Sequence, residues 1–188
     1  MVPMWALPLR LMARPFRGYR ALAEHPEEAS LPLAATRLLL VLGSMVAVSA
    51  TGRFAPAELV LAMVSFAWLP LIHAISLAFV VRFFARAVPW RRALAFYLEG
   101  VGPWLLLFLV FTGGILFAPH AERPAFVLFA PLLLGASVWG VLLSYALFRA
   151  GLDLPRRRAA FATLAFWVMN HVLILGYFLA VGQLWPIV

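Results

Sequence analysis

The 188-residue chain is 65% hydrophobic and only 12% charged, about half the charged share of a soluble domain, which excludes an ordinary soluble protein. It contains no cysteine, which excludes disulfides, thiolate metal sites and cysteine nucleophiles. All of its basic residues are arginine, and in a membrane chain the net charge of +8 indicates orientation in the bilayer and contact with anionic headgroups, with no nucleic-acid partner.

The first 30 residues predict a cytoplasmic or interfacial segment ahead of a transmembrane domain that takes up residues 31–188. Four arginines recur at helical spacing between apolar residues, a pattern typical of a helix lying on the membrane surface. They are Arg10, Arg14, Arg17 and Arg20. Pro8 and Pro15 predict that this helix is interrupted. The alternative interpretation is a basic flank that only sets the topology.

Five apolar stretches are each long enough to cross a hydrocarbon core of about 30 Å as a helix. They cover approximately residues 31–50, 56–83, 94–117, 124–148 and 159–184. Helix is the expected conformation, because lipid offers no partners for unpaired backbone groups. The sequence therefore predicts an all-α membrane protein, a bundle of five transmembrane helices preceded by the short interfacial segment.

The placement of the arginines predicts the orientation of these spans. With five spans, thirteen of the fifteen arginines fall on the side of the N-terminal segment, and only Arg53 and Arg123 fall on the other side. The positive-inside rule then places the N-terminus in the cytoplasm and the C-terminus, with Trp185 as an interfacial anchor, in the periplasm. We expect a multi-pass protein of a bacterial inner membrane.

Three parts of the sequence carry a likeness to a known family. They are RPFRGYRAL at residues 14–22 before the first span, WRRAL at 90–94 leading to GVGPW at 100–104, and LGASVW at 134–139 followed by RRAA at 157–160. In this order they resemble the bacterial branch of the Yip1 family of five-span membrane proteins. Leu98 and Glu99 stand where that family often has a Gly-Tyr pair. Eukaryotic relatives are linked to vesicle traffic and small GTPases, whereas bacterial relatives mostly have no assigned activity, so the resemblance implies topology more than function.

Polar side chains inside a bilayer are costly and are the first candidates for function. The predicted spans contain five such candidates: Arg37, His73, Glu99, Asn170 and His171. Arg37 and Glu99 lie at matching depth, so we expect an ion pair; the alternative is that each side chain snorkels to the interface. The histidines with Glu99 suggest a proton relay or a metal site. The interpretation we favour is structural, with neutral imidazoles that hydrogen-bond neighbouring groups.

Small residues recur every four positions on two spans, which allows helices to approach closely. These helix-packing candidates are Gly43 and Ala47 on the first span, and Ala136, Gly140 and Ser144 on the fourth. The pattern has two interpretations, packing within the chain or contact with a partner protein. Pro70, Pro103 and Pro131 fall inside or near the start of three spans, where they predict kinks.

Three classes of function are compatible with these features. The small-residue stripes and the lack of a catalytic motif predict a non-enzymatic scaffold or accessory subunit of a larger membrane assembly, with a membrane protein partner or a second copy of itself. The histidines, Glu99 and the prolines favour the alternative, a small oligomeric transporter or channel. An intramembrane enzyme acting on lipid rests on the same polar residues. No cofactor or metal is expected, because no HExxH, paired-histidine or glycine-rich phosphate motif occurs.

Overall fold

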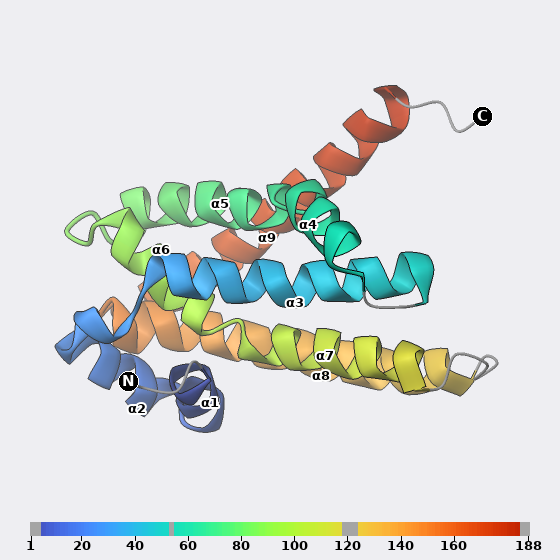
Figure 1. Cartoon of the computed structure of the whole chain (residues 1–188). Coiled ribbons are helices and arrows are strands. Elements are labelled where there is room, and N and C mark those ends of the chain that lie inside the picture. Colours follow the sequence, from blue (N-terminus) through green and yellow to red (C-terminus); the bar gives the residue numbers. More distant parts are fainter. Residues whose placement is uncertain (1–4, 53–54, 118–123, 185–188) are drawn as a thin grey trace.

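Every element in the described part of the chain, residues 5–52, 55–117 and 124–184 of a computed structural model, is a helix (Figure 1). The elements in chain order are α1 (Ala6–Ala13), α2 (Pro15–Glu24), η1 (Pro26–Glu28), α3 (Leu31–Thr51), α4 (Pro56–Ser65), α5 (Trp68–Phe84), α6 (Trp90–Glu99), α7 (Gly102–Phe117), α8 (Pro124–Ala146), η2 (Leu147–Gly151) and α9 (Arg156–Leu184). Of these, η1 is a 3-10 turn and η2 a π-helical turn. The all-α class expected from the sequence is therefore observed in these residues.

Among the described residues, four stretches of helix are long and apolar enough to cross a membrane. They are Pro26–Ala50, Pro56–Phe84, Ala130–Gly151 and Arg156–Val181. Helices α6 and α7 meet the same criterion together, but with a bend of 42° between them. The chain is thus a multi-pass membrane protein with four such helices, or five if the bent pair is one span.

The second and third predicted spans are interrupted helices. One break separates α4 from α5 at Phe66 and Ala67, and the other separates α6 from α7 at Gly100 and Val101. Two of the three prolines that the sequence analysis singled out begin a helix and do not kink one. Pro70 and Pro103 fall in the first turn after each break, where the missing N–H costs no helical hydrogen bond. Of these three prolines, Pro131 alone lies beyond the first turn of its helix, in the interior of α8.

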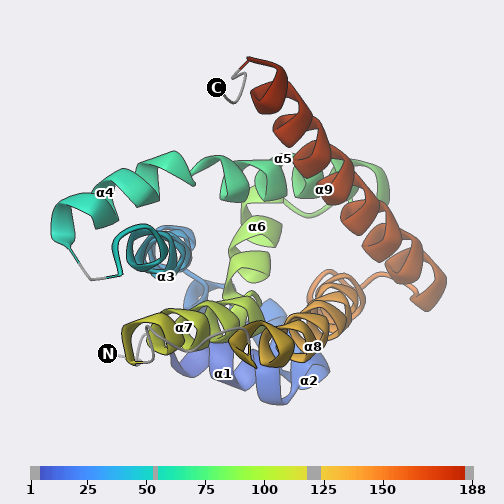
Figure 2. The same cartoon turned by 90° about the vertical axis from the view of Figure 1, so that its right-hand side faces the viewer.

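The N-terminal segment forms two helices that pack onto the bundle (Figure 2). Helix α1 contacts α6 and α7, and α2 contacts α8 and η2. Leu11, Tyr19 and Leu22 are buried in the common core, whereas the four predicted interfacial arginines are exposed. The break between the helices falls at Arg14, because Pro15 begins α2. We call α1, α2 and η1 the N-terminal cap.

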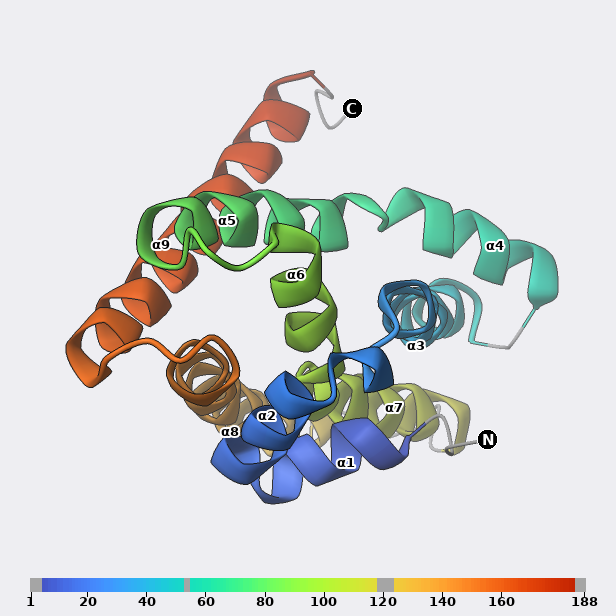
Figure 3. The same ribbon diagram turned by 90° about the vertical axis from the view of Figure 1, so that its left-hand side faces the viewer.

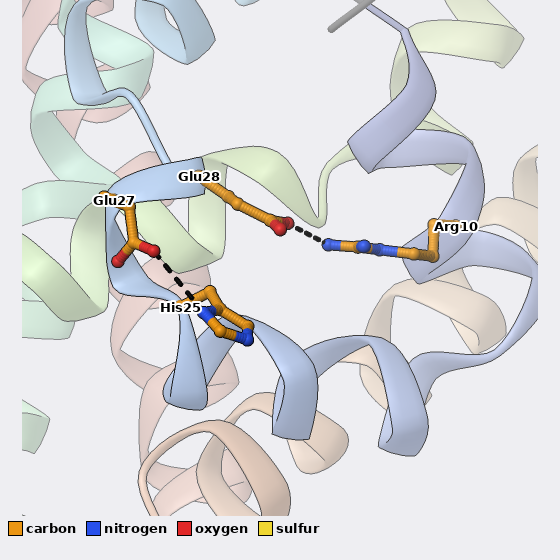
Figure 4. Close-up of polar contacts among 4 residues, drawn as sticks. All are labelled: Arg10, His25, Glu27 and Glu28. Atoms are coloured by element: carbon orange, nitrogen blue, oxygen red, sulfur yellow. Dashed lines mark hydrogen bonds and ion pairs between the residues drawn. The ribbon is translucent and has the colours of Figure 1, made fainter.

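Two polar contacts lie on the exposed side of the cap (Figure 4). Arg10 of α1 forms an ion pair with Glu28 of η1, and Nδ1 of His25 lies 3.4 Å from Oε1 of Glu27. Both contacts are solvent-exposed, and such pairs contribute little to stability, roughly 0–1 kcal/mol each. The buried leucines and Tyr19 are therefore the main attachment of the cap.

The membrane helices surround a core to which α3, α5, α6, α8 and α9 all contribute (Figure 3). Helix α3 packs against α4, α6 and α7, while α5 packs against α6 and α9. The C-terminal end of α9 projects outward from the bundle (Figures 1 and 3), although Tyr177 near this end still stacks on Trp68 of α5 with ring centres 4.1 Å apart. The most apolar stretch of α9 is only 11% buried, so most of α9 faces lipid or another protein.

The start of α3, the end of α5 and the end of α8 lie at the same end of the bundle, beside α2 (Figure 1). The chain segments at this end carry most of the arginines. Arg53, Arg123 and the C-terminal Trp185, on which the predicted orientation also depends, lie outside the described residues.

Candidate functional site

Arg37 and Glu99 form a buried ion pair between α3 and α6. The guanidinium Nη2 donates to Oε2 of Glu99 at 2.8 Å, and the side chains are only 1% and 2% exposed. Trp5 covers the guanidinium with its ring centre 5.6 Å from Cζ. The structure thus brings together the two residues that the sequence placed at matching depth.

The ion pair of Arg37 and Glu99 lies at the bend between α6 and α7. Glu99 is the last residue of α6, directly before the break that separates α6 from α7. Arg37 lies on α3, which packs against both of those helices. Because both charges are withdrawn from solvent, each depends on the other for compensation. The pair therefore fixes the bend between α6 and α7 to the first membrane helix.

Tyr19 of the cap contacts the same bend. Its side chain is buried, and a Cβ placed on Gly100 would lie 1.9 Å from the Tyr19 hydroxyl oxygen, so only glycine fits there. Burial raises the pKa of the Tyr19 phenol well above its ordinary value, with smaller contributions from Tyr97 and Glu99. The sequence analysis gave Tyr19 no role. The sequence offers no signal for this contact, because nothing in it pairs Tyr19 with Gly100, 81 positions further along the chain.

A second feature is a cavity of about 240 Å³ inside the membrane domain. Helices α3, α5, α6, α7, α8 and α9 all contribute to its wall. Its lining includes five aromatic side chains: Tyr97, Trp104, Phe108, Phe166 and Trp167. Three of the predicted polar candidates, His73, Asn170 and His171, line it as well. Both helix breaks border it, through Leu69 after the first and Val101 within the second.

The two histidines use one ring nitrogen in the same way. Nδ1 of His73 lies 2.8 Å from the carbonyl oxygen of Leu69, and Nδ1 of His171 lies 2.7 Å from that of Trp167. A carbonyl oxygen only accepts, so Nδ1 carries the proton in each ring. In the neutral imidazole, Nε2 is then left as an acceptor. The bonds join each histidine to its own helix, not to a neighbouring one.

The histidines belong to a set of packed rings. His73 stacks on Tyr97 with ring centres 5.4 Å apart and an angle of 26° between the planes. Tyr97 in turn meets Phe166 edge-on at 5.0 Å, and His171 lies 5.6 Å from Trp167. Glu99 is absent from the described residues that line the cavity, so the structure does not join the three residues of the suggested relay.

Asn170 is a buried polar residue of this cavity. It is 5% exposed, and its Oδ1 has no hydrogen-bond partner among the described residues. Buried polar atoms are nearly always paired, so each exception calls for an explanation. Phe166 and Trp167 precede Asn170 and His171 by one helical turn, so these four residues share one face of α9.

The small residues lie at helix contacts. A Cβ on Gly43 of α3 would be 2.6 Å from the side chain of Met63 of α4. Ala47 and Ala136 are buried, and Gly140 of α8 lies against Trp104 and Trp167. Ser144 accepts a hydrogen bond from Nε1 of Trp167 at 3.2 Å. These contacts agree with packing within the chain, and they leave the question of a partner open.

At the arginine-rich end, a surface groove of about 560 Å³ lies between the end of α5 and the start of α6. Its lining includes Arg82, Arg86 and Trp90. Two guanidinium groups beside an aromatic ring suit an anionic headgroup. In the described part of the chain, no group of three His, Asp or Glu side chains could hold a metal ion.

No known protein family, curated protein or solved structure matches this chain at a significant level.

Proposed function

We propose that this chain is a non-enzymatic scaffold or accessory subunit of a larger membrane assembly, built from five spans in a bacterial inner membrane. Its N-terminal cap faces the cytoplasm and its C-terminus faces the periplasm. The bent pair of α6 and α7 counts as the third span. Its partners are a membrane protein or a second copy of the chain, together with anionic lipid headgroups around the arginines.

The cap is the observation that carries this proposal. It presents exposed arginines on a surface outside the apolar helices, and its leucines and Tyr19 anchor it in the core. A fixed charged surface of this kind suits recognition of another molecule better than a mobile basic tail does, because less conformational entropy is lost on binding. The buried charges Arg37 and Glu99 are used to hold the bend, which favours a structural role for them.

Charge reversal on the cap tests the proposal. The full-length chain is purified from its native membrane in lipid nanodiscs, and its complexes are weighed by native mass spectrometry. We expect one complex of fixed stoichiometry, which the Arg14→Glu/Arg17→Glu variant dissociates. The matched control is Arg157→Glu, an exposed arginine of another segment, which should leave the complex intact. A chain that is always a lipid-bound monomer would contradict the scaffold.

Transport is the second candidate, and the cavity is the observation that favours it. Transporters place binding sites where discontinuous helices meet, and here two helix breaks border a cavity lined by His73, Asn170 and His171. A chain of this size would act as an oligomer. Flux of a solute in proteoliposomes, abolished by Asn170→Leu in a folded protein, would support transport over the scaffold.

Membership of the bacterial branch of the Yip1 family is a further part of the proposal. It rests on the likeness of the three sequence stretches, since the comparisons returned no match. Residues 14–22 lie in the N-terminal cap and the bend between α6 and α7 comes just before Pro103, so two of those stretches have a defined place in the fold. An experimental structure of an established bacterial member tests it: a cap tyrosine lying against a glycine at the third-span bend is expected, and a different helix order would refute it.

A further inference from the structure

The cavity has the size of a small ring compound. An engineered cavity of about 150 Å³ is large enough to hold benzene. The 240 Å³ here leaves room for two fused rings, or for one ring with substituents. Its walls are mostly flat, because Tyr97, Phe166 and the imidazole of His73 pack against one another as rings. Aromatic walls favour a planar occupant through offset and edge-to-face contacts.

The polar atoms of the cavity include donors, on the side chains of Tyr97, Trp104 and Asn170, and also acceptors. Oδ1 of Asn170 is buried and has no partner among the described residues, and the bonds made by Nδ1 of His73 and His171 leave Nε2 of each neutral ring as an acceptor. A ligand that matches the acceptors must bring hydrogen-bond donors, and a hydroxyl group suits both kinds of wall atom because it donates and accepts. A cationic donor would be costly at this depth in a bilayer, so the donors belong to neutral groups.

The ligand would reach the cavity through lipid. His171 lines the cavity and is also exposed on α9, so the cavity reaches the surface of the bundle there. Along α9, His171 lies 13 residues beyond Arg158, or roughly 20 Å at 1.5 Å per residue. That distance falls within the apolar thickness of a bilayer, about 30 Å, when Arg158 marks its surface. A compound that enters at this point must first dissolve in the membrane.

We propose that this cavity binds a planar aromatic ring that carries hydroxyl donors, a phenol or a hydroquinone. The ring lies among the aromatic side chains, and its hydroxyl groups donate to Asn170 and to Nε2 of the histidines. Two sources have this chemistry, a free phenol and the headgroup of a membrane quinol. The inference does not depend on the scaffold proposal, since a chain can bind such a ligand with or without a protein partner.

Binding of 2,6-dihydroxynaphthalene and of naphthalene to the full-length chain in nanodiscs tests the proposal by titration calorimetry. Affinities are expressed per mole fraction in the bilayer, so that partitioning into lipid cancels. The two probes share a ring system and differ only in the donors. We expect the dihydroxy compound to bind at least tenfold more tightly, a difference of about 1.4 kcal/mol. Equal binding of the two probes, or no binding of the dihydroxy compound, would overturn the proposal.

Variants locate the bound ring. Asn170→Leu should weaken binding of 2,6-dihydroxynaphthalene about tenfold and leave binding of naphthalene unchanged. The matched control is Thr163→Ala on the same helix, because that hydroxyl is equally buried, lies outside the cavity and already donates to the carbonyl oxygen of Ala159 at 2.8 Å. Equal loss in both variants would place the ring elsewhere and refute the site. The comparison of probes on the unaltered chain holds even if Asn170→Leu fails to fold.

A hydrocarbon tail on the probe distinguishes the two sources, a free phenol and a quinol headgroup. Methylhydroquinone and decylhydroquinone are compared under reducing conditions at equal mole fraction in the bilayer. Tighter binding of the tailed compound would mean that the tail leaves through the opening at His171, and would assign a quinol headgroup. Equal or weaker binding of the tailed compound would assign a free phenol. Both outcomes retain a hydroxylated ring as the ligand, whereas binding of neither compound would contradict it.

Discussion

Removing one member of the Arg37–Glu99 pair should destabilise the protein more than any surface substitution. In Glu99→Leu, the guanidinium of Arg37 stays about 99% buried but loses the carboxylate at 2.8 Å. At a separation of about 4 Å between charge centres and an effective dielectric constant of about 20, that attraction is about 4 kcal/mol. Breaking a buried pair from one side typically costs 3–5 kcal/mol, roughly the same amount. We therefore expect a loss of about 3–5 kcal/mol in the free energy of unfolding.

The double variant Arg37→Met/Glu99→Leu should recover most of this loss. It removes both buried charges, and apolar replacement of a buried pair is often neutral or stabilising. The assay is unfolding in mixed micelles by increasing SDS, followed by tryptophan fluorescence, with a double-mutant cycle for the coupling. Arg91→Met, an exposed arginine of α6, is the control and should change stability by less than about 0.5 kcal/mol. A Glu99→Leu variant as stable as that control would refute the structural role of the pair.

Other predictions follow from the cap and the groove. Gly100→Ala should lower the free energy of unfolding by about 1–3 kcal/mol, because the added Cβ would overlap the Tyr19 hydroxyl. The control Gly113→Ala has open space around the added Cβ and should not lower it. Equal melting temperatures of the two variants would contradict the contact between Gly100 and Tyr19. Because the pKa of Tyr19 is raised in the folded state, its contribution to stability is full below about pH 10 and is lost as pH rises further. Tyr19→Phe should flatten this decline in stability, measured by SDS unfolding between pH 9 and about pH 11. An unchanged slope would argue against a buried Tyr19 phenol. Arg82→Gln/Arg86→Gln should reduce the preference for anionic lipid by about 1 kcal/mol per arginine in native mass spectrometry, and unchanged lipid binding would exclude the groove.

The positions of the membrane helices follow from hydropathy, and the Arg37–Glu99 contact follows from depth alone. Both depend on position along the bilayer normal, which a single sequence encodes through the distance from charged flanks. The helix breaks were harder to locate. The sequence shows Pro70 and Pro103, but it does not show whether a proline kinks a helix or begins one, since that depends on where the preceding carbonyl groups find partners.

The cavity and the cap were not predictable for a related reason. Tyr97, Trp104 and Phe166 are aromatic residues in apolar helices, and lipid-facing and cavity-facing rings are alike in composition. Which face of each helix turns inward is set by the packing of six helices, not by local sequence. The cap arginines gave a correct helical pattern, but their spacing could not show that Leu11 and Leu22 bury themselves in the bundle instead of in the bilayer surface.

The number of spans is the central point on which the proposed orientation depends, and the two termini report it directly. Five spans place the termini on opposite sides of the membrane, whereas four place them on the same side. A reporter that is active only in the periplasm is fused after Val188 or after Arg20 of the full-length chain. The account predicts activity for the Val188 fusion alone. Activity of neither fusion would mean that α6 and α7 enter and leave the membrane on the same side, and would contradict the five-span topology.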